Sequence, residues 1–182
     1  MGKLFVISGS SGVGKGTVIK KFLEKHPEVK LSVSCTTRKP REGEAHGVNY
    51  FFLEPDEFKD SVGNVEFLDW AVFSGYMYGT KKAYVEKCLA EGNNLILEID
   101  TKGALNVKSL KKDAVLIFIL PPSFEELEAR LRGRHTETEE AIQKRLESTK
   151  LEMENSKMFD YKVVNDSIDN AVSELEKIIF GV

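Results

Sequence analysis

Cysteine and histidine are scarce in this chain, which has two cysteines and three histidines among its 182 residues. Cys35 and Cys88 show neither the close pairing of a disulfide framework nor the spacing of a zinc site. His26, His46 and His135 are scattered among residues typical of loops. We therefore expect two free thiols, buried or half-buried in a reducing cytoplasm, and no metal site built from histidine.

The sequence also lacks a strong excess of charge and a long apolar run. Its formal net charge is −3, whereas proteins that bind nucleic acid usually present a basic surface to the phosphate backbone. No stretch approaches the ~20 apolar residues of a membrane span, and no cleavage site follows the short N-terminal apolar run. We expect a cytoplasmic protein without a nucleic-acid, membrane or obligate protein partner.

Alternating strand-like and helix-like segments predict the fold class. Apolar strand-like runs occur at Leu4–Ser8, Asn94–Ile99, Val115–Leu120 and Tyr161–Val164. Helix-like runs occur at Lys15–Lys25, Lys81–Glu91, Gly103–Leu110, Ser123–Leu131, Thr138–Lys157 and Asp169–Phe180. This order predicts one α/β domain of three layers, with helices on both faces of a parallel sheet. Ser123 with Glu126, and Thr136 with Glu139, have the spacing of capping boxes at helix starts.

A glycine-rich segment lies between the first predicted strand and the first predicted helix. It consists of Gly9, Ser10, Ser11, Gly12, Val13, Gly14, Lys15, Gly16 and Thr17. Such glycines let successive backbone N–H groups point into one concavity, and the helix N-terminus adds a positive dipole end. Lys15 would place a cation on the outer phosphates. The segment predicts a nucleoside triphosphate site, and the flanking strand and helix disfavour the alternative of a flexible turn that binds nothing.

The residue after Lys15 departs from the strict phosphate-loop pattern. Gly16 stands where Ser or Thr is expected, and the hydroxyl comes one place later, at Thr17. This change leaves the backbone cradle intact, and Thr17 is the candidate Mg²⁺ ligand of the loop.

Two segments interrupt the regular alternation. Residues 33–80 are rich in arginine, glycine and aromatic residues and predict an inserted, mostly β subdomain. Residues 130–145 concentrate four arginines around Gly133, namely Arg130, Arg132, Arg134 and Arg145. They predict a hinged basic lid, with an ordinary solvated helix surface as the alternative.

Arg38 and Arg41 lie three residues apart beside hydroxyl side chains and a turn. Arginine binds phosphate oxygens in a bidentate manner, so this pair predicts a clamp for one phosphate group. Surface turns of this composition are common, but together with the glycine-rich loop the pair indicates that donor and acceptor both carry phosphate.

Distinctive sequence blocks occur along almost the whole chain, at residues 32–44, 47–52, 67–71, 78–80, 98–100, 118–123, 130–134, 144–145 and 164–166. In content and in order, these blocks resemble the guanylate kinase family. The resemblance implies a core of residues 1–32, 81–123 and 147–182, a GMP-binding insert at 33–80 and a small helical lid at 124–146. It also implies ATP-dependent phosphorylation of GMP, and of dGMP, in purine nucleotide metabolism.

The same resemblance implies roles for individual residues. Guanine would be faced by Ser34, Asp69 and Thr80. The GMP phosphate would be held by Arg38, Arg41, Tyr50 and Tyr78, with Glu44 as support. The GMP site would be completed by Gly79 and Glu98. Asp100 would order the acceptor or, together with Thr17, the water shell of Mg²⁺. The ATP phosphates would be reached by Arg134, Arg145 and Arg130, and adenine would lie near Asn165. The catalytic set is Lys15, Arg38, Arg134 and Arg145.

The chain departs from the family pattern at four positions. Asp69 replaces a typical Glu and Glu98 a typical Asp, and both changes preserve the charge. Lys102 stands where Gln often precedes Gly103, and His135 stands where Gly is usual.

Three alternative functions share some of these features. Another nucleoside monophosphate kinase would share the loop and the lid, but an acidic Asp69 suits the donors of guanine. A P-loop GTPase would carry an Asn-Lys-x-Asp pattern, which we do not find. A scaffold module that resembles guanylate kinase binds phosphopeptides, often without a working loop, whereas this chain keeps Gly14, Lys15 and Thr17.

Overall fold

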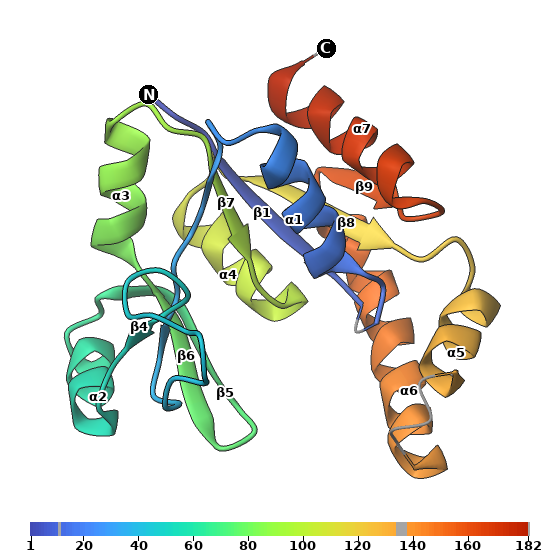
Figure 1. Ribbon diagram of the computed structural model, residues 1–182, viewed down its shortest axis with the longest axis horizontal. Helices are drawn as coiled ribbons and strands as arrows, with labels where there is room; N and C mark the ends of the chain where they lie inside the picture. Colours follow the sequence, from blue (N-terminus) through green and yellow to red (C-terminus); the bar gives the residue numbers. More distant parts are fainter. Residues whose placement is uncertain (11, 134–137, 182) are drawn as a thin grey trace.

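The computed structural model describes residues 1–10, 12–133 and 138–181, with the side chains of residues 130 and 131 outside the description. Its centre is a parallel sheet of five strands in the order β2-β7-β1-β8-β9 (Figure 1). These strands are β1 Leu4–Gly9, β2 Lys30–Leu31, β7 Leu95–Glu98, β8 Val115–Leu120 and β9 Tyr161–Val164. All four predicted strands are confirmed within one or two residues. The edge strand β2 was not predicted, because its two exposed residues carry no apolar pattern.

Helices cover both faces of this sheet, as predicted. Helices α1 (Lys15–Lys25) and α7 (Ile168–Phe180) pack against Phe5 and Ile7 of β1 on one face. Helices α3 (Lys82–Ala90) and α4 (Thr101–Leu110) pack against Leu4 and Val6 on the other. Because both faces are buried, the central strands read as continuous apolar runs. The loops at their carboxyl ends are therefore held by a rigid core.

A second sheet is formed by strands between residues 35 and 81, one residue beyond the predicted segment 33–80, and has the strand order β4-β3-β6-β5. Its strands are β3 Cys35–Thr36, β4 Phe51–Phe52, β5 Phe67–Phe73 and β6 Tyr76–Lys81. The prediction of a mostly β segment needs one correction, because the segment also contains helix α2, Pro55–Gly63. The start of α2 does have a sequence signal, namely Pro55 in the first turn followed by Asp56 and Glu57. The aromatic residues around this signal obscured it.

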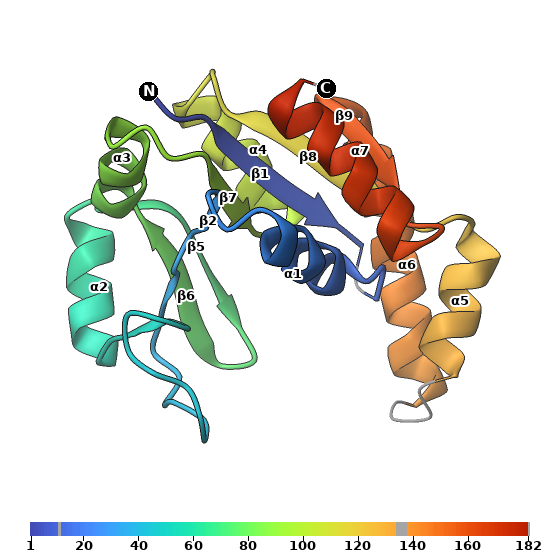
Figure 2. The same ribbon diagram turned by 45° about the horizontal axis from the view of Figure 1, so that its top comes forward.

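Two further helices form an arm at the other end of the molecule (Figures 1 and 2). They are α5 (Phe124–Arg132) and α6 (Glu139–Asn155), and a 3₁₀ turn, Ser156–Met158, follows α6. The predicted cap of α5 is confirmed, since the Ser123 hydroxyl accepts a hydrogen bond from the Glu126 N–H at 3.1 Å. The cap of α6 is Thr138, which accepts from the Ala141 N–H. The predicted Thr136 lies outside the described residues.

The two cysteines are free and buried, as expected. Burial raises the pKa of the Cys35 thiol to about 11. Cys35 is therefore a packing residue with little thiolate character at neutral pH. Within the described part of the chain, no helix is both long enough and apolar enough to cross a membrane.

Candidate functional site

The glycine-rich loop connects the end of β1 to the start of α1 at the carboxyl edge of the sheet. Gly9 leaves the strand so close to β8 that a Cβ atom there would lie 2.7 Å from the carbonyl oxygen of Ile119. Gly12 and Gly14 have φ angles of 84° and 88°, in the left-handed region that favours glycine. Gly14 is also the residue before the first turn of α1. These glycines turn the backbone so that its N–H groups and the helix N-terminus can face one anion.

Asn165 fixes the outer side of this loop. Its side-chain amide donates to the carbonyl oxygen of Val13 at 2.8 Å, and its backbone N–H donates to that of Leu120, also at 2.8 Å. A Cβ atom at Gly14 would lie only 2.8 Å from the Asn165 amide nitrogen. Asn165 therefore ties the loop to the end of β8 and requires glycine at position 14.

A cavity of about 590 Å³ adjoins the loop on this side. It is lined by Gly12, Gly14, Thr17, Gly133, Asn165, Asp166, Ser167 and Ile168. The structure thus brings Asn165 together with the glycine-rich loop. Its implied place near adenine stays a prediction. Gly133 and the segment after Asn165 were not predicted, because a cavity wall made of backbone and small side chains has no sequence motif.

The predicted cations differ in how the structure places them. Lys15 is the first residue of α1 and is half-buried, and Arg145 is half-buried on α6. Arg134 and Ser11 lie outside the described residues, as does the side chain of Arg130. Arg132 is bound within the arm, where it forms ion pairs with Glu128 and Glu139.

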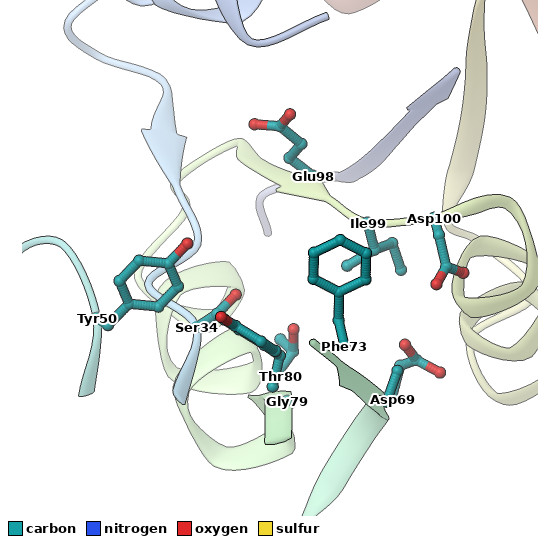
Figure 3. A pocket seen from close by; sticks show the side chains of 11 residues that line it. Ser34, Tyr50, Asp69, Phe73, Gly79, Thr80, Glu98, Ile99 and Asp100 are labelled. Carbon is teal, nitrogen blue, oxygen red and sulfur yellow. The ribbon is translucent and has the colours of Figure 1, made fainter. Parts of the chain in front are cut away.

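A second cavity, of about 300 Å³, lies between the two sheets (Figure 3). It is lined by Ser34, Tyr50, Asp69, Ala71, Phe73, Tyr78, Gly79, Thr80, Glu98, Ile99 and Asp100. Most residues predicted for the acceptor therefore meet at one place, although they come from segments far apart in sequence. In the view of Figure 3, Tyr50 and Ser34 lie on one side of Phe73, and Asp69 and Asp100 on the other. Phe73 and Ile99 were not predicted, because an isolated apolar side chain has no signal that separates a cavity wall from a core.

Arg38 and Arg41 do not line this cavity, but Glu44 holds their segment beside it. Arg38 donates to Glu44 at 2.9 Å, and the backbone N–H of Arg41 donates to the other oxygen of Glu44 at 2.8 Å. The guanidinium of Arg38 lies 5.5 Å from the ring centre of Tyr50, which is a wall residue of the cavity. The hydrogen bond from Arg38 lowers the pKa of Glu44, so this carboxylate stays ionised. The side chain of Arg41 is exposed.

Asp69 is the half-buried carboxylate of the cavity. Burial raises its pKa, a hydrogen bond from Asn106 lowers it, and the charge of Asp100 raises it. The Asn106 amide donates to Asp69 Oδ1 at 3.2 Å, and a Cβ atom at Gly103 would collide with Asp69 Oδ2. Asp100 caps α4 by accepting from the Gly103 N–H at 2.7 Å. The first two turns of α4, through Gly103 and Asn106, therefore set the position of both carboxylates.

Glu152 is a further acidic residue near the loop that the sequence analysis did not select. Burial raises its pKa, whereas attraction to Lys15 and the proximity of the Ser10 hydroxyl lower it. Helix α6 carries several other glutamates, so nothing in the sequence separates Glu152 from surface glutamates. Only the packing of α6 identifies it.

Comparison with known proteins gives one consistent result. The sequence model of the family described as guanylate kinase matches residues 1–181. The chain is 51% identical to a guanylate kinase of Clostridium perfringens over 180 residues, covering 99% of this chain and 83% of that protein. It is 46% identical to a guanylate kinase of Trichodesmium erythraeum, covering 98% and 96% of the two chains.

A solved structure gives the same assignment at the level of the fold. The crystal structure of guanylate kinase from Anaplasma phagocytophilum superposes with a TM-score of 0.76 at 31% identity, covering 99% of this chain and 85% of that chain. The match extends across the core, the second sheet and the helical arm, because it covers nearly the whole chain. By sequence and by fold, this chain belongs to the guanylate kinase family.

Proposed function

We propose that this chain catalyses the transfer of the terminal phosphoryl group of ATP to GMP, and also to dGMP, to form ADP and the nucleoside diphosphate. The observation that carries the proposal is the pair of cavities on one rigid core. One cavity adjoins a phosphate loop, and the other is lined by carboxylates and hydroxyls. A kinase that transfers a phosphoryl group from one nucleotide to another needs both cavities, whereas a GTPase or a peptide-binding module needs only one binding cavity.

The donor site is the loop together with the cavity beside Asn165. We assign ATP binding to Gly9, Ser10, Ser11, Gly12, Val13, Gly14, Lys15, Gly16, Thr17, Arg130, Arg134 and Asn165. The left-handed backbone at Gly12 and Gly14 supports this assignment, since it lets N–H groups converge on a phosphate. Lys15 would follow the phosphates as a mobile cation, and the base would occupy the larger cavity.

The acceptor site is the cavity between the two sheets. We assign GMP binding to Ser34, Arg38, Arg41, Glu44, Tyr50, Asp69, Tyr78, Gly79, Thr80, Glu98 and Asp100. Asp69 would accept from the adjacent N1–H and 2-amino donors of guanine, and the hydroxyls of Ser34 and Thr80 would donate to O6. Arg38 and Arg41 would bind the phosphate at the rim, next to Tyr50.

The residues present fit Mg²⁺ bound mainly by nucleotide and water. Among the described residues, no three carboxylate, histidine or cysteine side chains form a metal-binding group. Thr17 lines the donor cavity and Asp100 the acceptor cavity, and both offer the hard oxygen atoms that Mg²⁺ prefers. When bound, Mg²⁺ would neutralise phosphate charge. We propose that Thr17 and Asp100 contact its water shell.

The chemical step requires positioning and charge neutralisation rather than a general base. The GMP phosphate is already an anionic nucleophile, so no proton has to be removed from it. Two polyanions must approach in line, which accounts for cations on separate elements: Lys15 on α1, Arg38 beside β3 and Arg145 on α6. Arg134, which lies outside the described residues, is the fourth proposed cation. We propose that these four residues stabilise the charge of the transferring group.

We also propose that the chain works as a core of residues 1–32, 81–123 and 147–182, an acceptor insert of residues 33–80 and a lid of residues 124–146. Closure of the insert and lid over both nucleotides would exclude water that could hydrolyse ATP. The free, buried thiols support a cytoplasmic location, in which cysteines stay reduced.

One experiment tests the function directly. ADP release from ATP should be measured with GMP, dGMP, IMP, AMP, CMP and UMP as acceptors. We expect GMP and dGMP to support turnover, IMP to support less, and the others to support very little. Equal turnover of AMP and GMP would contradict the assignment, and no turnover with any acceptor would favour a binding module.

A further inference from the structure

The hairpin of β5 and β6 presents one face to the acceptor cavity. Side chains of a strand alternate between two faces, so Asp69, Ala71 and Phe73 of β5 point to the same side. All three line the cavity, whereas the intervening Trp70 and Val72 do not. Toward its tip, the hairpin therefore contributes a carboxylate, then a methyl group, then an aromatic ring.

A tight turn fixes the end of this row. Phe73 pairs with Tyr76 in the last rung of the hairpin, and the two residues between them, Ser74 and Gly75, have φ angles of 50° and 81°. Positive φ angles at both positions are typical of the two-residue turn whose twist matches that of the flanking strands. Phe73 is therefore placed by a regular hairpin and not by a long loop.

Between Asp69 and Phe73, this face of β5 carries only the methyl group of Ala71. The two outer residues are four positions apart, which corresponds to about 13 Å of strand. The short side chain between them leaves space for a flat ring system whose edge meets the carboxylate. In the view of Figure 3, the Phe73 ring lies between Asp69 on one side and Ser34 on the other. This wall thus has a polar end for hydrogen bonds and an aromatic end.

Phe73 is highly exposed for a residue of a cavity wall. Its surface is 72% accessible, whereas Ala71 and Ile99, the aliphatic residues of the same wall, are half-buried. A single exposed apolar side chain needs no functional explanation by itself. Phe73 differs because it adjoins a cavity with converging carboxylate and hydroxyl groups, which is the composition of a small-molecule site. A flat ligand placed there would remove the ring from water.

We propose that Phe73 stacks on the guanine base of GMP and covers it on the exposed side of the cavity. The hydrogen-bonding groups of a base lie in its plane, so Asp69, Ser34 and Thr80 contact only its edges. The faces of the base are bound by apolar or aromatic side chains, and the ring of Phe73 supplies such a contact. This inference rests on the proposed function, in which this cavity binds GMP.

Titration calorimetry with GMP alone tests the contact without turnover. Phe73→Ala should weaken GMP binding about tenfold or more, the usual effect of removing an aromatic ring from a stacked base. Phe73→Tyr keeps the ring and should bind GMP within about twofold of the wild type. Phe73→Leu is apolar but not flat and should bind GMP clearly more weakly than Phe73→Tyr. Val72→Ala, at a 63% exposed position on the other face of the hairpin, is the matched control and should not change binding.

Stacking involves the ring system of the base and not its edges. Phe73→Ala should therefore weaken GMP and IMP binding by the same factor, whereas Asp69→Asn should change their ratio. In steady-state kinetics, Phe73→Ala should raise the KM for GMP and leave kcat nearly unchanged, since the contact is equal in ground state and transition state. Because the side chain is largely exposed, the melting temperature should stay that of the wild type.

Fluorescence gives a direct signature of the stack. Trp70 is the single tryptophan of the chain, so Trp70→Phe combined with Phe73→Trp moves the only indole ring to the cavity. A purine stacked on an indole ring quenches its emission. GMP should therefore quench this variant strongly, and ADP should not. Trp70→Phe combined with Val72→Trp puts the indole on the other face of the hairpin and is the control, in which GMP should cause no quenching.

Three results would overturn the inference. The first is equal GMP affinity in Phe73→Ala and the wild type. The second is equal GMP affinity in Phe73→Leu and Phe73→Tyr, which would make Phe73 an apolar cover without stacking. The third is unquenched emission when GMP is bound to the variant with the indole at position 73. None of these results contradicts the proposed function, which fails instead if the wild type binds GMP but transfers no phosphoryl group to it. A wild type that does not bind GMP would overturn both.

Discussion

Arg38 and Glu44 form an ion pair with a distance of 2.9 Å between Nη2 and Oε1, in which the arginine side chain is only 12% exposed. The same carboxylate accepts a hydrogen bond from the backbone N–H of Arg41. Glu44 therefore closes the segment 38–44 into a fixed loop and holds the guanidinium before any phosphate arrives. The proposed clamp is preorganised, with its charge balanced by Glu44 in the absence of substrate.

The first prediction concerns this clamp. Arg38→Lys keeps the charge but loses the planar fork, so it should raise the KM for GMP about tenfold or more and leave the KM for ATP unchanged. Steady-state kinetics with each substrate varied in turn measures this. Lys39→Ala, at an exposed neighbouring position, is the control and should have little effect. If Lys replaces Arg38 freely, the phosphate is bound elsewhere.

The second prediction concerns recognition of the base. Asp69→Asn turns one carboxylate oxygen into an amide donor that faces the donors of guanine, so kcat/KM for GMP should fall steeply, by ~10²-fold or more. ATP affinity should hardly change. Asp56→Asn, on the exposed surface of α2, is the control. Unchanged selectivity between GMP and AMP in Asp69→Asn would show that Asp69 does not read the base.

The third prediction separates two effects of replacing a glycine by alanine: strain from the left-handed backbone, and collision of the added Cβ atom with a neighbour. Gly14 and Gly92 have nearly equal φ angles, 88° and 85°, but only at Gly14 would a Cβ atom meet a neighbour, the Asn165 amide. Both alanine variants should lose about 1–2 kcal/mol of unfolding free energy to left-handed strain. Gly14→Ala should lose more and should also bind ADP more weakly. Urea unfolding and ADP titration measure these effects, and equal losses in the two variants would contradict the contact.

The fourth prediction concerns closure. GMP together with a non-hydrolysable ATP analogue should make the molecule more compact than either ligand alone, because in the proposed mechanism the insert and the lid would approach each other only over two bound nucleotides. Small-angle X-ray scattering measures the radius of gyration in the four states. An unchanged radius with both ligands bound would argue against domain closure.

The fifth prediction concerns pH and the C-terminal helix. His26 contacts Glu176 of α7 at 2.9 Å and Glu28 at 3.1 Å, and the hydrogen bond to Glu176 is the main reason that its pKa is raised from 6.5. Its stabilising contribution is therefore complete below pH about 6.5 and is lost as the pH rises through the higher pKa of the folded state. Lys25 also pairs with Glu176, at 3.1 Å.

His26→Gln should remove this pH-dependent part of the stability. The wild-type melting temperature should fall between pH about 6 and 8 by more than that of the variant, since the histidine reference pKa of ~6.5 lies in this window. His46→Gln is the control, because His46 lies in the acceptor insert, away from α7. Identical pH profiles for wild type and His26→Gln would exclude the effect.

Elements with strong local patterns could be predicted from the sequence. The central strands are continuous apolar runs because both faces of the sheet are buried. Gly14 and Lys15 marked the proposed phosphate loop for an equally local reason, since such a loop needs particular backbone angles and a cation at a set distance along the chain. The insert was predicted only in part, because aromatic residues concealed the weaker start signal of α2.

The tertiary structure alone decided which side chains share a site. Glu152, Asn106 and Phe73 resemble ordinary surface or core residues in the sequence, yet Glu152 lies near the glycine-rich loop, Asn106 donates to Asp69, and Phe73 lines the acceptor cavity. Asn106 and Asp69 are 37 positions apart. By itself the sequence determined the strands, the loop and the chemistry of its motifs, since these depend on neighbours along the chain. The contacts of Glu152 and Asn106 depend on how whole helices pack against the sheets, and no short stretch of sequence encodes that packing.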